Sequence, residues 1–353
     1  MTRPARPFII PVFLPHSGCP CRCVFCNQSA ITGQTDAFPS PDTLRQHVDS
    51  FLNYKGPNRH PVQLSFYGGN FLGQETGRIL PLLETAGEWV RQGKVDSLRF
   101  STRPDTVVPD TLRLIRDYPI TTIELGVQSM DGRVLALSRR GHTPQATVEA
   151  VHRLKADGYE VGLQMMVGLP GDSPEATHRT GRILAELAPD FVRIYPTVVL
   201  AGSPLAGWYA SGRFQPISME EAIDRVKRLY LLFTRHTIPV IRMGLQASSD
   251  LEPGASVLAG PYHPAFGHRV YARMFRDMAT LALEREQAKG QAVTLRVNPR
   301  CISRMQGLKK QNIQWLSRRF NQPDITVSPD PKIAENTVAT TGRQIQLSDL
   351  ASG

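Results

Sequence analysis

Four of the five cysteines in this 353-residue chain lie close together, in the segment Cys19-Pro-Cys21-Arg-Cys23-Val-Phe-Cys26. Cys19, Cys23 and Cys26 have the spacing C-x3-C-x2-C, which suits a loop folded around a cubic iron–sulfur cluster. Three thiolates leave one iron of such a cube without a protein ligand. Because a small molecule can bind at an open iron, the spacing predicts a reactive metal site rather than a purely structural one.

An open iron can chelate the amino and carboxylate groups of S-adenosylmethionine and hold its sulfonium beside the cluster. A reduced cluster can then pass one electron into the carbon–sulfur bond and release a 5′-deoxyadenosyl radical, which abstracts hydrogen from unactivated carbon. In such chemistry the cofactor performs the difficult step, while the protein orients the reactants and excludes water and oxygen. We therefore expect a [4Fe-4S] cluster and S-adenosyl-L-methionine as cofactors.

Zinc is the alternative metal, because the four clustered cysteines could in principle form a set of four thiolate ligands. Structural zinc sites usually combine two separated C-x2-C halves, and this sequence offers no second half. A zinc site would make the chain a non-catalytic, metal-stabilised interaction module. Under the cluster interpretation, Cys21 is a spare thiol and Cys301 is an ordinary buried cysteine.

The elements that position the cysteine loop follow a βα rhythm. Pro directly after Ser or Thr predicts a helix start at Ser40-Pro41, Thr143-Pro144 and Ser173-Pro174. Short β-rich apolar runs alternate with these helix-like stretches. The expected strands are Phe8–Leu14, Val62–Tyr67, Ser97–Ser101, Thr122–Val127, Val161–Val167 and Phe191–Pro196.

Six βα units predict a parallel sheet covered by helices, and they are too few for a closed eight-fold barrel. We therefore expect an α/β fold: a partial, open (β/α)6 TIM-like barrel with a C-terminal α/β extension. Unusual residues gather at the carboxyl ends of the expected strands, where such barrels carry their chemistry. They are the cysteine loop, Gly68-Gly69-Asn70, Arg103-Pro104-Asp105, Gln128-Ser129 and Gly168-Leu-Pro-Gly171.

The pattern changes beyond about residue 200, which divides the chain into three expected parts. Residues 1–200 form the partial barrel core, residues 201–320 form an extension that completes the site, and residues 321–353 form a loosely held tail. The extension is expected to contain helices near Ser218–His236 and Ala265–Lys289 and strands at Pro239–Leu245 and Val293–Val297.

The charge balance favours polyanionic partners. Lys and Arg outnumber Asp and Glu by 41 to 31, giving a net charge of +10, which favours RNA, DNA or an acidic surface. Simple solubility explains the same excess equally well. The basic residues are scattered, apart from local pairs such as Lys309-Lys310 and Arg318-Arg319.

The sequence predicts a cytoplasmic protein with no membrane partner. No apolar run approaches the ~20 residues that span a bilayer. The apolar stretch near the N-terminus is broken by Pro11 and ends at Pro15, so we interpret it as a strand rather than an export signal. An odd number of tightly clustered cysteines argues against a secreted disulfide framework.

Motifs spread over about residues 8–320 resemble those of radical S-adenosylmethionine enzymes, specifically those similar to the catalytic subunit of Elongator. In order, the motifs are Gly-Cys19-Pro with Cys23-Val-Phe-Cys26-Asn-Gln, Phe66-Tyr-Gly-Gly69, Ser101-Thr-Arg-Pro-Asp105, Ile123-Glu-Leu-Gly-Val-Gln-Ser129, Arg139-Arg-Gly-His142-Thr, Met165-Met-Val-Gly-Leu-Pro-Gly171 and Arg193-Ile-Tyr-Pro196-Thr.

The resemblance implies Cys19, Cys23 and Cys26 as the cluster ligands. It also implies that the backbone of Phe25 meets the adenine and that Gly68-Gly69 approaches the methionine amino group. The family often has Glu at the third position of the glycine motif, where this chain has Asn70. A charged contact to the amine is therefore not expected there, although a carbonyl could replace it.

The same resemblance implies further cofactor contacts from later strands. Gln128, with Glu124 nearby, suits the ribose hydroxyls, and Arg140 suits the methionine carboxylate through its guanidinium fork. Met165 and Met166 would line the adenine, although their alternation along a strand turns one of them toward the helices. The alternatives are a salt bridge for Glu124 and an exposed charge at a helix end for Arg140.

The leading functional prediction is a radical enzyme that modifies tRNA or another RNA and receives electrons from a donor such as flavodoxin or ferredoxin. The alternative keeps the radical chemistry but applies it to a small molecule or cofactor precursor, as in anaerobic porphyrin-forming relatives. The Elongator subunit carries a following acetyltransferase domain, for which a chain ending at Gly353 leaves no room. We therefore do not expect the acetyl-dependent step.

Overall fold

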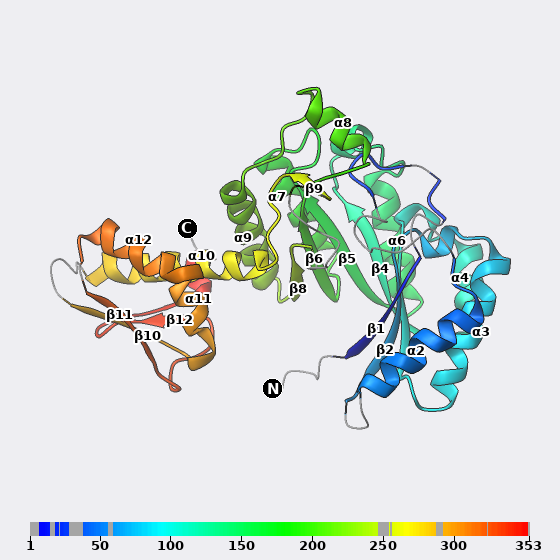
Figure 1. Ribbon diagram of the computed structural model, residues 1–353, viewed down its shortest axis with the longest axis horizontal. Coiled ribbons are helices and arrows are strands. Elements are labelled where there is room, and N and C mark those ends of the chain that lie inside the picture. Colours follow the sequence, from blue (N-terminus) through cyan, green and yellow to red (C-terminus); the bar gives the residue numbers. More distant parts are fainter. Residues whose placement is uncertain are drawn as a thin grey trace.

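The computed structural model describes residues 7–14, 18–20, 22–27, 38–55, 59–245, 254, 256–286, 292–322 and 324–351. Its centre is an open sheet of seven parallel strands in the order β1-β2-β3-β4-β5-β6-β8 (Figure 1). The strands are β1 (Phe8–Phe13), β2 (Val62–Tyr67), β3 (Ser97–Thr102), β4 (Ile120–Gln128), β5 (Glu160–Val167), β6 (Phe191–Pro196) and β8 (Val240–Met243).

The prediction of a partial, open barrel with a C-terminal extension is confirmed. All six expected strands form, and β8 adds a seventh by pairing in parallel with β6. The sequence pattern places this strand in the extension instead, because the βα rhythm of the sequence changes beyond about residue 200, before the strand begins. The core sheet therefore continues beyond residue 200.

The two faces of the sheet differ in chemistry because side chains alternate along each strand. On β5, Leu163 and Met165 are fully buried in the apolar core, whereas Gln164 points to the other face and reaches Glu124 on β4. Residues such as Arg99 on β3 and Arg193 on β6 join the same polar face. The sheet thus has an apolar face covered by helices and a concave face lined by polar side chains.

Helices of the core pack on the outer, apolar face of the sheet (Figure 1). They are α2 (Pro41–Lys55), α3 (Thr76–Arg91), α4 (Pro109–Ile115), α6 (Pro144–Ala156), α7 (Pro174–Glu186) and α9 (Met219–Arg235), and the short helix α5 (Gly132–Leu137) follows β4. The predicted starts are confirmed: the side chains of Thr143 and Ser173 accept hydrogen bonds from the backbone N–H of Ala146 and Ala176, and Pro follows each cap.

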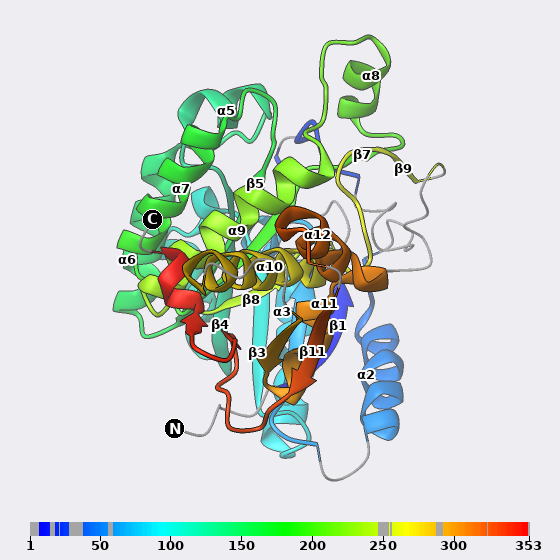
Figure 2. The same cartoon turned by 90° about the vertical axis from the view of Figure 1, so that its left-hand side faces the viewer.

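The extension contains a long helix, α10 (Phe266–Glu286), that packs against α9 and carries a second, four-stranded sheet (Figures 1 and 2). Its helices include α11 (Ile302–Gln306) and α12 (Gln311–Phe320). Its strands are β11 (Ile325–Pro329), β10 (Val293–Val297), β12 (Thr337–Ala339) and β13 (Gln344–Gln346), in that spatial order.

The expectation of a loosely held tail from residue 321 is wrong for the described part of that segment. β11 pairs in parallel with β10, and β12 pairs with β10 from the other side. Val338 and Ile345 are buried in the main core cluster. These strands are short and separated by polar turns, so their apolar residues are too few to show a clear period in the sequence.

Smaller elements lie at the carboxyl end of the main sheet. They are the 3-10 turns η1 (Phe71–Gly73) and η2 (Pro104–Thr106), the two-stranded ribbon of β7 (Val199–Leu200) and β9 (Val257–Ala259), and α8 (Pro204–Ala210). Two further 3-10 turns, η3 (Pro299–Cys301) and η4 (Leu308–Lys310), lie in the extension, and η5 (Leu347–Ala351) follows β13. Within the described ranges, no helix is long and apolar enough to cross a bilayer.

Candidate cofactor site

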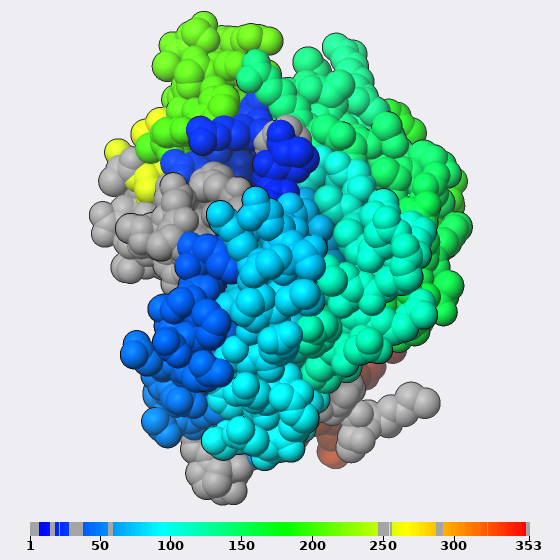
Figure 3. All heavy atoms as spheres, turned by 90° about the vertical axis from the view of Figure 1, so that its right-hand side faces the viewer, coloured from blue at the N-terminus to red at the C-terminus, as the bar shows by residue number. Residues whose placement is uncertain are grey.

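The cysteine loop leaves the carboxyl end of β1 and is held by backbone hydrogen bonds to two distant parts of the chain. Val24, which is fully buried, donates from its N–H to the carbonyl of Ser138 at 3.1 Å. The carbonyl of Val24 accepts from the N–H of Leu205 in α8 at 2.8 Å. In Figure 3 the dark-blue N-terminal atoms lie at the surface directly below the green segment that contains α8. The loop is therefore fixed between α5 and α8.

The three predicted cluster ligands lie near one another in this loop. Cys23 is buried, while Cys19 and Cys26 are partly exposed, and all three are reduced. Burial, together with the neighbouring thiols of Cys23 and Cys19, raises the pKa of Cys26 to about 12. Holding three thiolates here therefore requires a positively charged group, and an iron–sulfur cluster fits this donor set.

Of the other two cysteines, only Cys301 lies within the described residues. Cys21 falls outside the described residues, so its expected role as a spare thiol stays a prediction. Cys301 is 1% exposed in the core of the extension, as expected. Among the described side chains, no three His, Cys, Asp or Glu groups are arranged to hold a single metal ion.

Arg140 places a positive charge beside the cysteines. Its guanidinium is buried, and Nη1 donates to Sγ of Cys23 at 3.3 Å. Nη2 donates to the carbonyl of Gly126 near the end of β4. The positive charge of Arg140 lowers the pKa of Cys26, against the larger effects that raise it. The alternative of an exposed charge at a helix end is therefore excluded.

Gln128 lies where β4 is interrupted at the rim of the sheet. The register with β5 shifts between Gly126 and Gln128, and Gln128 adopts a left-handed φ of 67°. Its Oε1 is buried and accepts no hydrogen bond from any described residue. A buried acceptor without a donor is unfavourable, and a ribose hydroxyl would supply that donor. Gly68 and Gly69 also have positive φ, at 78° and 55°, which glycine adopts readily.

Asn70 has a structural role that the sequence analysis missed. It is fully buried, and its Nδ2 donates to the carbonyl of Gly18 at 2.9 Å. Its Oδ1 accepts from the hydroxyl of Thr102 at 2.7 Å and from the N–H of Arg103 at 3.0 Å. Asn70 therefore ties the start of the cysteine loop to the ends of β2 and β3. The only sequence signal for this role was the position of Asn70, a polar residue directly after two glycines at the end of a strand.

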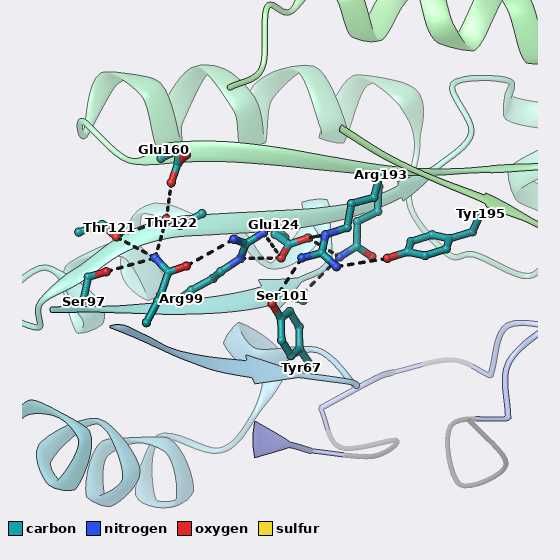
Figure 4. Close-up of polar contacts among 12 residues, drawn as sticks. Tyr67, Ser97, Arg99, Ser101, Thr121, Thr122, Glu124, Glu160, Arg193 and Tyr195 are labelled. Carbon is teal, nitrogen blue, oxygen red and sulfur yellow. Dashed lines mark hydrogen bonds and ion pairs between the residues drawn. The ribbon is translucent and has the colours of Figure 1, made fainter. Parts of the chain in front are cut away.

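Glu124 lies inside the half-barrel, in the middle of β4, rather than at the strand end (Figure 4). Its Oε1 accepts from Nε of Arg99 at 2.6 Å, and its Oε2 lies 2.7 Å from Nε of Arg193. Gln164 donates to the same Oε2 at 3.0 Å. Burial is the largest single effect on the pKa of the Arg193 guanidinium and lowers it, but Glu124 together with Tyr195 and Tyr67 raises the pKa overall. The salt-bridge alternative therefore describes the observed contacts of Glu124.

Two tyrosines extend this polar network toward the carboxyl end of the sheet. Arg193 donates to the hydroxyls of Tyr67 and Tyr195 at 3.4 and 3.5 Å (Figure 4). Burial raises the pKa of Tyr195, so its phenol is neutral near pH 7. The concave face thus combines buried arginines, the buried carboxylate of Glu124 and two phenols.

The structure also changes the choice between the two methionines. Met165 lies in the apolar core, on the same side of β5 as Leu163 and Val167. Met166 is partly exposed and shares the concave face with Gln164. We therefore correct the prediction: Met166, and not Met165, is placed to line a ligand. Phe25 is partly buried and packs near Val199 and Leu205, and its expected adenine contact stays a prediction.

These features define a class of protein. Residues 13–183 match the Radical SAM superfamily model, and residues 189–276 match the model of the Radical_SAM C-terminal domain. The two matches cover most of the half-barrel, the cysteine loop and part of the extension. The chain belongs to the radical SAM superfamily and is a radical SAM enzyme, a family whose members bind a [4Fe-4S] cluster and S-adenosylmethionine.

Within this family the chain is similar to the Elongator catalytic subunit and its prokaryotic counterparts. It is 28% identical over 299 residues to a tRNA uridine(34) acetyltransferase of Dehalococcoides mccartyi, covering 71% of this chain and 65% of that protein. It is 30% identical over 184 residues to Elongator complex protein 3 of Bos taurus, covering 51% of this chain and 32% of that protein.

A solved structure of the archaeal Methanocaldococcus infernus Elp3 has the same fold. The TM-score is 0.59 at 22% identity, and the match covers 77% of this chain and 63% of that one. The chain spans less than two thirds of the length of these relatives.

Proposed function

We propose that this radical SAM enzyme holds its [4Fe-4S] cluster through Cys19, Cys23 and Cys26 and modifies tRNA. The observation that carries the proposal is the convergence of three thiols, the buried guanidinium of Arg140 and the buried acceptor of Gln128 at the carboxyl end of one sheet. Parallel α/β sheets bind their ligands at this end.

Each residue would have a definite task. The cysteine thiolates would bind three irons, and Arg140, whose guanidinium lies beside Cys23, would bind the methionine carboxylate. Gln128 would accept a hydrogen bond from a ribose hydroxyl, and Gly68-Gly69 would let the backbone approach the methionine amino group, because glycine lacks a Cβ. When bound, the cluster and S-adenosylmethionine would supply one-electron cleavage of the sulfonium carbon–sulfur bond. Asn70 would keep the cysteine loop in place.

The tRNA substrate is supported by the relatives named above and by the net charge of +10. Two buried arginines, Arg99 and Arg193, share a single carboxylate, Glu124, on the concave face. An excess of positive charge in a half-barrel would attract an anionic substrate. A one-electron donor such as flavodoxin or ferredoxin would reduce the cluster.

Anaerobic reconstitution tests the cofactors. Iron and sulfide should each approach four per chain, and reduced protein should convert S-adenosylmethionine to 5′-deoxyadenosine. Cys19→Ala, Cys23→Ala and Cys26→Ala should each lose the cluster, whereas Cys21→Ala and Cys301→Ala should retain it. Tightly bound zinc in untreated protein, with no 5′-deoxyadenosine, would contradict the proposal. Loss of iron in Cys21→Ala equal to that in Cys23→Ala would contradict the ligand assignment.

Salt-dependent binding tests the substrate class. The affinity for tRNA should fall steeply between low and moderate salt, because phosphate contacts release counterions. A binding curve that does not change with salt, together with 5′-deoxyadenosine formation that only a small molecule stimulates, would replace tRNA by the small-molecule alternative.

A further inference from the structure

One side of α12 and the turn before it form a surface of basic, amide and aromatic side chains. We name it the α12 face, and it consists of Lys309, Lys310, Gln311, Gln314, Trp315 and Arg318, all of which are exposed. Its helical members recur at intervals of three and four residues, so they lie along one side of the helix.

The opposite side of α12 is anchored to the extension, which keeps the α12 face turned to solvent. Leu316 is fully buried, and Asn312 is 2% exposed. Nδ2 of Asn312 donates to the carbonyl of Ala272 in α10 at 2.8 Å and to the carbonyl of Met305 in α11 at 3.0 Å. Figure 2 shows α12 lying across α10 at the front of the extension.

Positive charge is concentrated around this surface. Residues 307–322 contain two lysines and two arginines but no acidic residue. Residues 292–351 hold nine Lys and Arg against four Asp and Glu, a net +5. Half of the protein's net charge therefore lies in about a sixth of its length. In the part of the chain that the structure describes, Lys309, Lys310 and Arg318 form no ion pair, whereas Arg319 lies 3.7 Å from Glu284.

Trp315 gives the face an aromatic platform. Its side chain is 38% exposed, although tryptophan is usually largely buried. The guanidinium of Arg276 lies 4.4 Å from the ring centroid, a cation–π contact that steadies the indole. Aromatic rings flanked by basic side chains are typical of surfaces that stack nucleic-acid bases and hold their phosphates.

The turn before α12 holds its two lysines in an unusual backbone conformation. Lys309 and Lys310 have φ values of 49° and 59°. Residues other than glycine rarely occupy this left-handed region, and such strain is often found at functional sites. It places two adjacent lysines at the N-terminal end of the α12 face.

We propose that the α12 face binds RNA, with an unpaired base stacked on Trp315 and phosphates held by Lys309, Lys310 and Arg318. The face lies beyond residues 13–183 and 189–276, which match the family models, so it is additional to the cofactor site. RNA binding at the α12 face would deepen the proposed function. It rests on that function only for the identification of the RNA as tRNA. Figure 1 shows α12 at one end of the long axis, well separated from the cysteine loop. Only a ligand of macromolecular size can reach both.

Binding measurements on the full chain test the proposal. Fluorescence anisotropy of labelled tRNA and of a single-stranded oligouridine would be followed from low to moderate salt. Lys309→Ala/Lys310→Ala should reduce the slope of log K against log salt by about 1.4, at ~0.7 per single-strand phosphate contact. Trp315→Ala should weaken binding roughly tenfold, and Trp315→Phe should recover most of the loss because a ring remains.

A matched control uses two exposed basic residues of the core. Lys94→Ala/Arg113→Ala removes the same charge from the segment after α3 and from α4, and should leave the salt slope unchanged. An equal loss in this control would show a general charge effect and overturn the proposal. Unchanged affinity and slope in the α12-face variants, with their circular dichroism intact, would overturn it too.

Two further outcomes separate the alternatives. If polyglutamate competes as well as oligouridine of equal charge, and Trp315→Ala has no effect on either, the face binds an acidic protein segment and not RNA. If wild-type protein forms no 5′-deoxyadenosine but the α12-face variants still lose RNA affinity, the proposed function fails while the α12 face stands.

Discussion

The guanidinium of Arg140 donates to the thiol of Cys23 at 3.3 Å, across 117 positions of sequence. This contact joins the loop after β1 to the turn after α5, and it brings a permanent positive charge to the thiols. It also explains why Arg140 is 7% exposed although it follows another arginine in a short connecting segment. The proposed cluster ligands and the proposed contact to the methionine carboxylate therefore share one structural neighbourhood.

We predict that Arg140→Gln lowers the affinity for S-adenosylmethionine without removing iron. The loss should be about tenfold or more, because a charge-assisted contact to a carboxylate contributes ~1.5–3 kcal/mol. Equilibrium dialysis and iron analysis on reconstituted protein measure the two effects separately. The adjacent Arg139 is exposed, so Arg139→Gln is a matched control that should change neither. Unchanged binding in Arg140→Gln would rule out the carboxylate contact.

Asn70→Ala should destabilise the half-barrel and loosen the cysteine loop. The change removes the donor to Gly18 and leaves the N–H of Arg103 and the hydroxyl of Thr102 without their acceptor. A buried unsatisfied group costs ~1–3 kcal/mol, so the loss should exceed that of an ordinary surface substitution. Urea unfolding would measure the loss of stability, and iron retention during gel filtration would report the loosening of the cysteine loop. Asn53→Ala on the exposed side of α2 is the control, and equal stability of the two variants would refute the role of Asn70.

Glu124→Gln should cost about 3–5 kcal/mol of unfolding free energy, because it leaves Arg99 and Arg193 buried beside a neutral amide. Denaturant unfolding at pH 7 would show the change as a lower midpoint. Adding Arg193→Met should restore part of the loss, since it removes one uncompensated charge. The exposed Glu149→Gln is the control and should stay within ~1 kcal/mol of wild type. An equally small effect of Glu124→Gln would show that the network is not a structural unit.

His142 should make the protein less stable in mild acid. Burial, reinforced by Arg140 and partly opposed by Asp105, lowers the pKa of His142 from 6.5 to about 3. The unfolded chain therefore binds a proton below pH ~6.5 that the folded protein excludes until about pH 3. Stability from this residue is complete above pH ~6.5 and falls by ~1.4 kcal/mol per unit as the pH drops toward about 3.

The measurement is the difference in unfolding free energy between pH 7 and pH 5. Wild type should lose ~2 kcal/mol more than His142→Gln, because glutamine does not titrate in this range. His152 is exposed, so His152→Gln should keep the wild-type pH dependence. Identical pH dependence in His142→Gln and wild type would show that His142 binds its proton equally in the folded and the unfolded chain.

Local patterns predicted much of the fold. The expected strand Val62–Tyr67 coincides with β2, and Val293–Val297 coincides with β10. Such segments are recognisable because a buried parallel strand is a short apolar run bounded by turn residues. The helix starts at Pro144 and Pro174 were predictable because the cap and the following proline act within one turn. β8 was recognised as a strand, but its neighbour in the sheet was not.

The sequence by itself determined the spacing of Cys19, Cys23 and Cys26, the βα rhythm and, through a series of short motifs, the enzyme class, because each of these is recognised from short local runs of residues. Only the tertiary structure decided that Glu124 lies between two arginines, that Met166 rather than Met165 faces the concave side, and that Asn70 holds Gly18. Such contacts arise from strand register and from packing between distant segments, and a shift of one residue along a strand turns a side chain to the opposite face.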